Sequence, residues 1–89
     1  MLPKNRPPTH PGEILLEEFL KPRNMTQSEL AEKLKIPLQR VNSIINAKRG
    51  VTPETAVLLS RFFETTAQYW MNLQTQYELW FAERSVGRT

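Results

Sequence analysis

The side chains best suited to chemistry in this sequence lie in a short polar stretch around Arg40. Gln39 can make two hydrogen bonds to the edge of an adenine base, and Arg40 can make two to a guanine. Leu38 is apolar and can contact the methyl group of a thymine. Asn42 and Ser43 add further hydrogen-bonding groups. The stretch therefore predicts recognition of base edges in DNA by Leu38, Gln39, Arg40, Asn42 and Ser43.

Amide and cationic side chains flank this stretch on both sides. Gln27 precedes the stretch. Asn46, Lys48 and Arg49 follow it within six residues of Ser43. Proteins that bind DNA make half or more of their hydrogen bonds to phosphate and sugar, which border the groove that exposes the base edges. We therefore predict that four residues bind phosphates: Gln27, Asn46, Lys48 and Arg49.

The charge of the chain is distributed in the way that phosphate binding requires. The formal net charge is +3. Residues 26–50 contain five Lys and Arg against two Glu, whereas residues 51–89 contain four Glu against three Arg. A local excess of cations favours a polyanionic partner. On composition alone, the alternative of ordinary solvated helix faces is equally acceptable.

Two short helices are predicted to position these side chains. The first begins after Thr26, because a threonine at the N-cap and Glu29 three residues later can satisfy each other's backbone donors. The helical pattern stops at residues 35–37 and then resumes. Apolar residues recur at helical spacing on both sides of the break: Leu30, Ala31 and Leu34 before it, and Val41, Ile44 and Ile45 after it. Two such helices joined by a tight turn are the layout of a DNA-binding helix-turn-helix.

The segment resembles the helix-turn-helix of phage-repressor type regulators. The similarity is carried by eight residues: Gln27, Glu29, Leu30, Ala31, Val41, Ile44, Asn46 and Lys48. Lys35 stands where that family usually has the turn glycine, so a residue with a side chain would adopt positive φ, at a cost on the order of 1 kcal/mol. Pro37 stands where the recognition helix usually has a polar N-cap; it presets φ for the first turn but offers no side-chain acceptor.

Other segments resemble the antitoxins of the HigA type. Residues 10–15, 50–56, 70–74 and 77–80 carry this similarity in order, together with the pattern Pro-x-x-Arg-hydrophobic-Asn that begins at Pro37. The resemblance covers residues 10–80. It implies a lambda-repressor-like DNA-binding domain and the function of a type II antitoxin, which neutralises a small HigB-type ribonuclease toxin and represses its own operon.

The whole chain is predicted to be all-α, as a bundle of five helices. The first helix has Pro11 at position N1 and ends before Pro22. The motif supplies the next two, and a fourth begins after Thr52. The fifth begins at Thr65 or Thr66, with Gln68 completing a capping box, and continues past residue 80. We expect a flexible, basic, proline-rich arm at residues 1–9, the domain at residues 10–84 and a disordered tail at residues 85–89.

The fifth predicted helix carries more aromatic residues than one small domain can cover. Trp70 and Leu73 are assigned to the core, because they continue the helical spacing of the bundle. Tyr77, Trp80 and Phe81 lie nearer the end, and aromatic residues are favoured anchors of protein interfaces. We predict that these three residues form a homodimer interface. A two-fold dimer would match a palindromic operator.

Catalysis, cofactor binding and export have no support in this sequence. The sequence contains no cysteine, which removes disulfides and thiolate sites, and no acidic or histidine cluster has the spacing of metal ligands. His10 stands at a helix start without a catalytic partner and is expected to cap that helix. No apolar run approaches the roughly 20 residues that span a bilayer, and no secretion signal is evident. We therefore expect a cytoplasmic, non-enzymatic protein without cofactor, metal or membrane partner.

Two alternatives to the antitoxin hypothesis stay open. The first is a stand-alone transcriptional repressor of the same fold without a toxin, which no residue of the chain distinguishes from an antitoxin. The second is a protein-interaction module whose helix-turn-helix has lost DNA binding. Only the unusual Leu38 and Lys35 support this second alternative.

Overall fold

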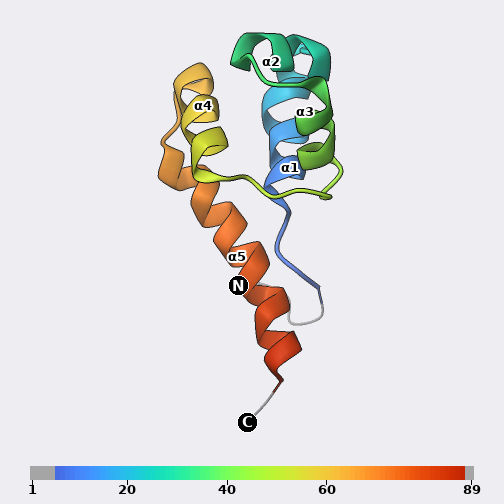
Figure 1. The fold of residues 1–89 in the computed structure, drawn as a ribbon, viewed down its shortest axis with the longest axis vertical. Helices are drawn as coiled ribbons and strands as arrows, with labels where there is room; N and C mark the ends of the chain where they lie inside the picture. The colour runs from blue at the N-terminus through green and yellow to red at the C-terminus, as the bar shows by residue number, and fades with distance from the viewer. Residues whose placement is uncertain (1–5, 88–89) are drawn as a thin grey trace.

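The computed structural model describes residues 6–87, and every element within them is helical. Figure 1 shows a bundle of short helices from which the last helix extends. The predicted all-α fold is confirmed. The elements in chain order are α1 (Pro11–Ile14), the π-helical segment η1 (Leu15–Leu20), the 3-10 segment η2 (Lys21–Arg23), α2 (Gln27–Leu34), α3 (Leu38–Ile45), α4 (Pro53–Phe63) and α5 (Ala67–Val86).

The first helical run is longer than predicted. It starts at Pro11, as expected, and His10 caps it, because the His10 Nδ1 atom accepts a hydrogen bond of 2.8 Å from the Gly12 N–H. Burial lowers the pKa of His10, which favours the neutral ring that this bond requires. The predicted end before Pro22 is wrong, since η2 continues the run to Arg23. The Lys21 N–H donates to the Leu16 carbonyl, five residues back, so the helix is already widened directly before Pro22, which has no N–H to donate.

The core lies between the helices, and Trp70 is its largest fully buried side chain. The Trp70 side chain has no exposed surface, and its Nε1 atom donates a hydrogen bond of 2.8 Å to Thr65 Oγ1. Leu73 is only partly buried but packs against the same core. The prediction that Trp70 and Leu73 are core residues is confirmed. The buried apolar residues are Leu15, Leu20, Leu30, Ala31, Leu34, Val41, Ile44, Val51, Ala56, Leu59, Phe63 and Trp70.

The first helix approaches α3 at a distance that only glycine permits. A Cβ atom added to Gly12 would lie 1.8 Å from the carbonyl oxygen of Ile44. The atoms that this Cβ would meet all belong to the backbone of Ile44 and Ile45, so no flexible side chain can move aside. The helix that carries the predicted base contacts is therefore held directly against the start of the chain's first helix.

Helix α5 begins after Thr66, one of the two residues predicted at its start, but it lacks the predicted capping box and ends later than the predicted domain. Its N-cap is Thr66, whose hydroxyl accepts a hydrogen bond of 3.0 Å from the Tyr69 N–H. Gln68 does not complete a capping box, because its amide donates to Asn72 Oδ1 instead. The helix continues through Val86, so residues 85–86 are helical and do not belong to a tail.

The structure describes only part of the predicted N-terminal arm and of the predicted C-terminal tail. Pro8 is buried, which places the end of the predicted arm against the domain. Residues 1–5 and 88–89 lie outside the described residues, so the flexibility predicted for them remains a prediction. Among the helices of residues 6–87, none is long and apolar enough to cross a membrane.

Candidate nucleic-acid interface

The first helix of the motif starts as predicted. Thr26 Oγ1 accepts a hydrogen bond of 3.0 Å from the Glu29 N–H, and Glu29 Oε1 accepts one of 2.8 Å from the Thr26 N–H. This reciprocal capping box fixes the residue at which α2 begins. The side chain of Gln27 is thereby placed in the first turn of α2, next to α3.

The turn between α2 and α3 has the strained residue that the sequence predicts. Lys35 has φ of 60° and donates its N–H to the carbonyl groups of Ala31 and Glu32. Pro37 is the N-cap of α3 with φ of −62°, and it provides no side-chain hydrogen bond. Its carbonyl accepts the N–H of Arg40 at 3.0 Å, so the first turn of α3 forms without a polar cap.

Helix α3 buries one face and presents the predicted base-contacting residues on the other. Val41 and Ile44 are buried, with exposed fractions of 1% and 2%. Gln39 and Asn42 are exposed, Arg40 and Ser43 are half-buried, and Leu38 is 44% exposed. An outward polar face beside an inward apolar face is what a groove-entering helix needs.

One hydrogen bond joins the two helices of the motif at this surface. The Asn42 Nδ2 atom donates to Gln27 Oε1. From the sequence, Asn42 is expected at bases and Gln27 at phosphates, with no contact predicted between them. The bond leaves Asn42 Oδ1 and the Gln27 amide nitrogen for other partners, and it restricts both side chains. No sequence signal reveals it, because the residues are 15 positions apart.

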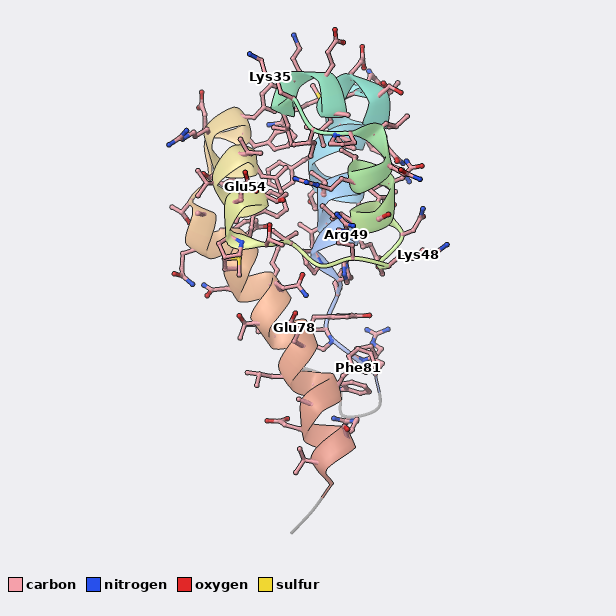
Figure 2. The ribbon with its side chains drawn as sticks, viewed as in Figure 1. Lys35, Lys48, Arg49, Glu54, Glu78 and Phe81 are labelled. Carbon is pink, nitrogen blue, oxygen red and sulfur yellow. The ribbon has the colours of Figure 1, made fainter. Side chains whose placement is uncertain are left out.

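The segment after α3 folds back and holds three of the four predicted phosphate-binding residues. The carbonyl oxygen of Ser43 accepts the N–H groups of both Lys48 and Arg49, at 2.8 and 3.1 Å. Ala47 makes this reversal possible with φ of 60°. Asn46, Lys48 and Arg49 are all exposed. Figure 2 shows Lys48 pointing away from the helices and Arg49 on the chain that leaves α3.

Four predicted site residues surround one hollow of about 410 Å³ beside α3. It is lined by Pro37, Gln39, Arg40, Ser43 and Arg49. A neighbouring hollow of about 140 Å³ brings Glu54, at the start of α4, to the edge of this surface. Nothing in the sequence pattern placed Glu54 there.

The cations of this surface are available to a polyanion. In residues 6–87 the structure has a single ion pair, which joins Lys21 to Glu17 at 2.9 Å. Arg40, Lys48 and Arg49 therefore have no carboxylate partner among the described residues. Their charge is free to meet phosphates.

The predicted interface residues of α5 form a row of packed aromatic rings. The ring centroids of Tyr77 and Phe81 are 4.9 Å apart, and those of Trp80 and Phe81 are 5.0 Å apart. Tyr77 also packs edge-on against His10 at 4.7 Å. Phe81 is 45% exposed, whereas Tyr77 and Trp80 are half-buried. The structure thus brings the three aromatics together and ties Tyr77 to the start of α1.

Comparison with known proteins agrees with this geometry. The family described as "Helix-turn-helix" matches residues 16–70, more than half of the chain. Virulence-associated protein I of Dichelobacter nodosus is 46% identical over 78 residues, which cover 88% of this chain and 72% of that protein. The chain belongs to the Xre-type helix-turn-helix family.

Other Xre-type relatives carry more specific names. The uncharacterized HTH-type transcriptional regulator YbaQ of Escherichia coli K12 is 42% identical over 81 residues, covering 91% of this chain and 72% of that one. The solved structure of Pseudomonas aeruginosa antitoxin HigA with the higBA promoter is 44% identical, with a TM-score of 0.85, covering 88% of this chain and 85% of that chain. The resemblance to HigA-type antitoxins is confirmed.

A test of the predicted phosphate contacts of this Xre-type domain is the salt dependence of DNA binding. Lys48→Ala should weaken binding to operator and random DNA alike, because phosphates carry no sequence information. The slope of log affinity against log salt should decrease in magnitude by roughly 1 for each phosphate that is no longer bound. Lys33→Ala, on the exposed side of α2, is the control. An unchanged slope for Lys48→Ala would show that this side chain does not bind DNA.

Proposed function

We propose that this protein is the antitoxin of a type II toxin-antitoxin system and the repressor of its own operon. The observation that carries the proposal is the surface of α3, where the outward side chains predicted to contact bases lie close to Lys48 and Arg49, and Arg40, Lys48 and Arg49 have no carboxylate partner in residues 6–87. The 44% identity to an antitoxin solved with its promoter supports the same role. The proposed role is binding rather than catalysis, in the cytoplasm, without a cofactor. The first test of this proposal is the affinity of the protein for the promoter of its own gene.

The proposal includes a homodimer that binds a palindromic operator. The molecule measures 46 by 23 by 23 Å, and the lower part of α5 extends beyond the other helices. Phe81 and Leu79 are 45% and 53% exposed on this extension. A second copy would cover such a helix, and its recognition helix would reach a half-site about 34 Å away.

Phe81→Glu should convert the dimer to a monomer, because it places a charge in the proposed apolar contact. Light scattering at tens of micromolar should then give half the wild-type mass, with a large decrease in operator affinity. Val57→Glu is the matched control, since Val57 is also an exposed apolar residue but lies on α4. A wild-type monomer both with and without DNA would refute the dimer.

The toxin is proposed to contact the acidic first helical run. Glu13, Glu17 and Glu18 are exposed there, although Glu17 is paired with Lys21. A basic ribonuclease would be attracted to this surface, and charge complementarity speeds association. An ordinary solvated helix face is the competing explanation for the same residues.

Replacing Glu13, Glu17 and Glu18 together by Gln should weaken capture of a co-expressed HigB-type toxin and reduce growth rescue, while leaving operator binding intact. Glu32→Gln is the control, because it neutralises one exposed carboxylate on α2, outside the proposed toxin surface. Intact capture by the triple variant, with capture abolished on removal of the arm or of the end of α5, would reject this surface but retain the antitoxin.

The stand-alone repressor is the second candidate, and the similarity to the transcriptional regulator YbaQ favours it. The two candidates differ in whether a toxin partner exists. Purification of the native complex followed by mass spectrometry distinguishes them. Operator binding without any co-purifying small basic protein would support the stand-alone repressor.

A further inference from the structure

Gln74 is a buried polar residue of α5 that lies outside the predicted DNA-binding surface. Its exposed fraction is 5%. Its Oε1 atom accepts a hydrogen bond of 2.7 Å from the Val51 N–H, and its Nε2 atom donates one of 3.0 Å to Glu78 Oε2. The side chain thus connects α5 to the segment between α3 and α4. Figure 2 shows Glu78 on α5, below the segment between α3 and α4.

The Val51 backbone depends on this contact. Val51 is 3% exposed, so its N–H group has little access to water. The acceptor comes from a residue 23 positions later rather than from a neighbouring turn. Because a buried donor needs a partner, the Gln74 amide fixes where the chain runs at Val51.

Gly50 shows how closely the chain passes over this amide. A Cβ atom at Gly50 would lie 2.6 Å from Gln74 Nε2 and 2.8 Å from Gln74 Oε1. Gly50 does not have positive φ, so its backbone conformation does not require glycine. The requirement is space for the Gln74 amide.

The position of Val51 in turn restrains the cations that precede it. Lys48 and Arg49 are held at one end by Ser43 and are followed directly by Gly50 and Val51. The Ser43 carbonyl on α3 and the Gln74 amide on α5 therefore hold the two ends of residues 48–51. Removal of either contact would let the two cations move relative to α3.

We propose that Gln74 is a positioning residue for DNA binding, which holds Lys48 and Arg49 in place for phosphates through its hydrogen bond to Val51. The proposal rests on the DNA-binding function proposed above. It assigns to α5 a role in the DNA-binding surface besides its proposed role in dimerisation. Gln74 itself touches no DNA.

Substitutions of Gln74, alone and combined with Glu78→Gln, test the role of its hydrogen bonds. Gln74→Leu should weaken operator binding about tenfold and decrease the magnitude of the salt slope by roughly 1, the decrease expected when one phosphate is no longer bound. Gln74→Glu should also weaken binding, because it brings a second carboxylate beside Glu78. The double variant Gln74→Glu with Glu78→Gln should recover affinity to within about twofold. In that variant the carboxylate introduced on α5 could accept hydrogen bonds from both the Val51 N–H and the new amide one turn later.

Gln76→Leu is the matched control, because Gln76 is an exposed residue of the same helix. It should leave the affinity and the salt slope unchanged. The slope also separates positioning from mere destabilisation. When circular dichroism shows the same folded fraction over the salt range, a variant that only lowers this fraction reduces affinity by the same factor at each salt concentration and leaves the slope as it was.

A double-mutant cycle with Gly50 gives an independent test. Gly50→Ala should displace the Gln74 amide and reduce operator affinity as much as Gln74→Ala does. In the Gln74→Ala background, the amide is already absent, so Gly50→Ala should change affinity by less than about twofold. Additive effects of the two substitutions would overturn the proposal.

The outcomes also separate this inference from the proposed function. If Lys48→Ala lowers the salt slope but Gln74→Leu does not, Gln74 does not position the cations and the DNA-binding surface stands. If the wild-type protein shows no preference for its own promoter, the DNA-binding function itself fails. Amide exchange at Val51 should accelerate in Gln74→Leu and not in Gln76→Leu; unchanged exchange would also overturn the proposal.

Discussion

Gly12→Ala should destabilise the fold by about 3 kcal/mol and abolish operator binding near the temperature at which the variant unfolds. The added Cβ atom would lie 1.8 Å from the Ile44 carbonyl oxygen and 2.7 Å from its carbonyl carbon. Because both atoms belong to the backbone of α3, relief requires the first helix and α3 to separate. Urea unfolding followed by circular dichroism measures the decrease in stability, and DNA titrations at increasing temperature, up to the unfolding midpoint of the variant, measure the functional effect.

Gly87→Ala is a suitable control for the Gly12 variant. Gly87 has φ of 79° and no atom within 4 Å of an added Cβ, so alanine there meets backbone strain but no clash. Its backbone has ψ of −165°, outside the left-handed helical region, and the expected cost of this strain is about 1 to 2 kcal/mol. A Gly12→Ala variant as stable as Gly87→Ala would contradict the close approach of α1 and α3.

Arg40→Ala should cost about 1 to 3 kcal/mol of operator affinity for each half-site contacted. Arg40 is half-buried on the outward side of α3, lines the hollow with Gln39 and Arg49, and has no carboxylate partner in residues 6–87. The substitution would remove a bidentate hydrogen bond to guanine, so the variant should accept other bases at one position of each half-site. In the proposed dimer both half-sites are affected, so the decrease in operator affinity should be about twice that of a single half-site, without loss of the fold.

The measurement for Arg40 is a competition series with operators changed at single base pairs. Arg61→Ala is the control, because Arg61 is exposed near the end of α4, outside the motif. It should lower affinity slightly or not at all, without changing base preference. Equal operator affinity for wild type and Arg40→Ala would refute the assignment of Arg40 to a base.

Local features of the DNA-binding motif were predictable from the sequence. The capping box of Thr26 and Glu29, the positive φ of Lys35 and the proline start of α3 all formed as expected. Each depends on residues within a few positions of one another, whose backbone groups must be satisfied whatever the rest of the fold does. The spacing of Val41 and Ile44 likewise determined which side of α3 faces outward, because apolar residues at helical spacing define a buried face.

Other features depended on how the helices meet in space. The edge-on packing of Tyr77 against His10 required α5 to pass the start of α1. The hydrogen bond between Gln27 and Asn42 required α2 and α3 to cross at a particular place. None of these follows from composition or spacing.

The sequence by itself determined the helical class, the motif and the residues that face outward from it. The tertiary structure alone decided the close approach of Gly12 to Ile44 and the contact of Gln74 with Val51. These contacts join residues that are 32 and 23 positions apart. A hydrophobic pattern specifies which face is buried but not the distance between two backbones, since that distance is set by the packing of all the side chains between the helices.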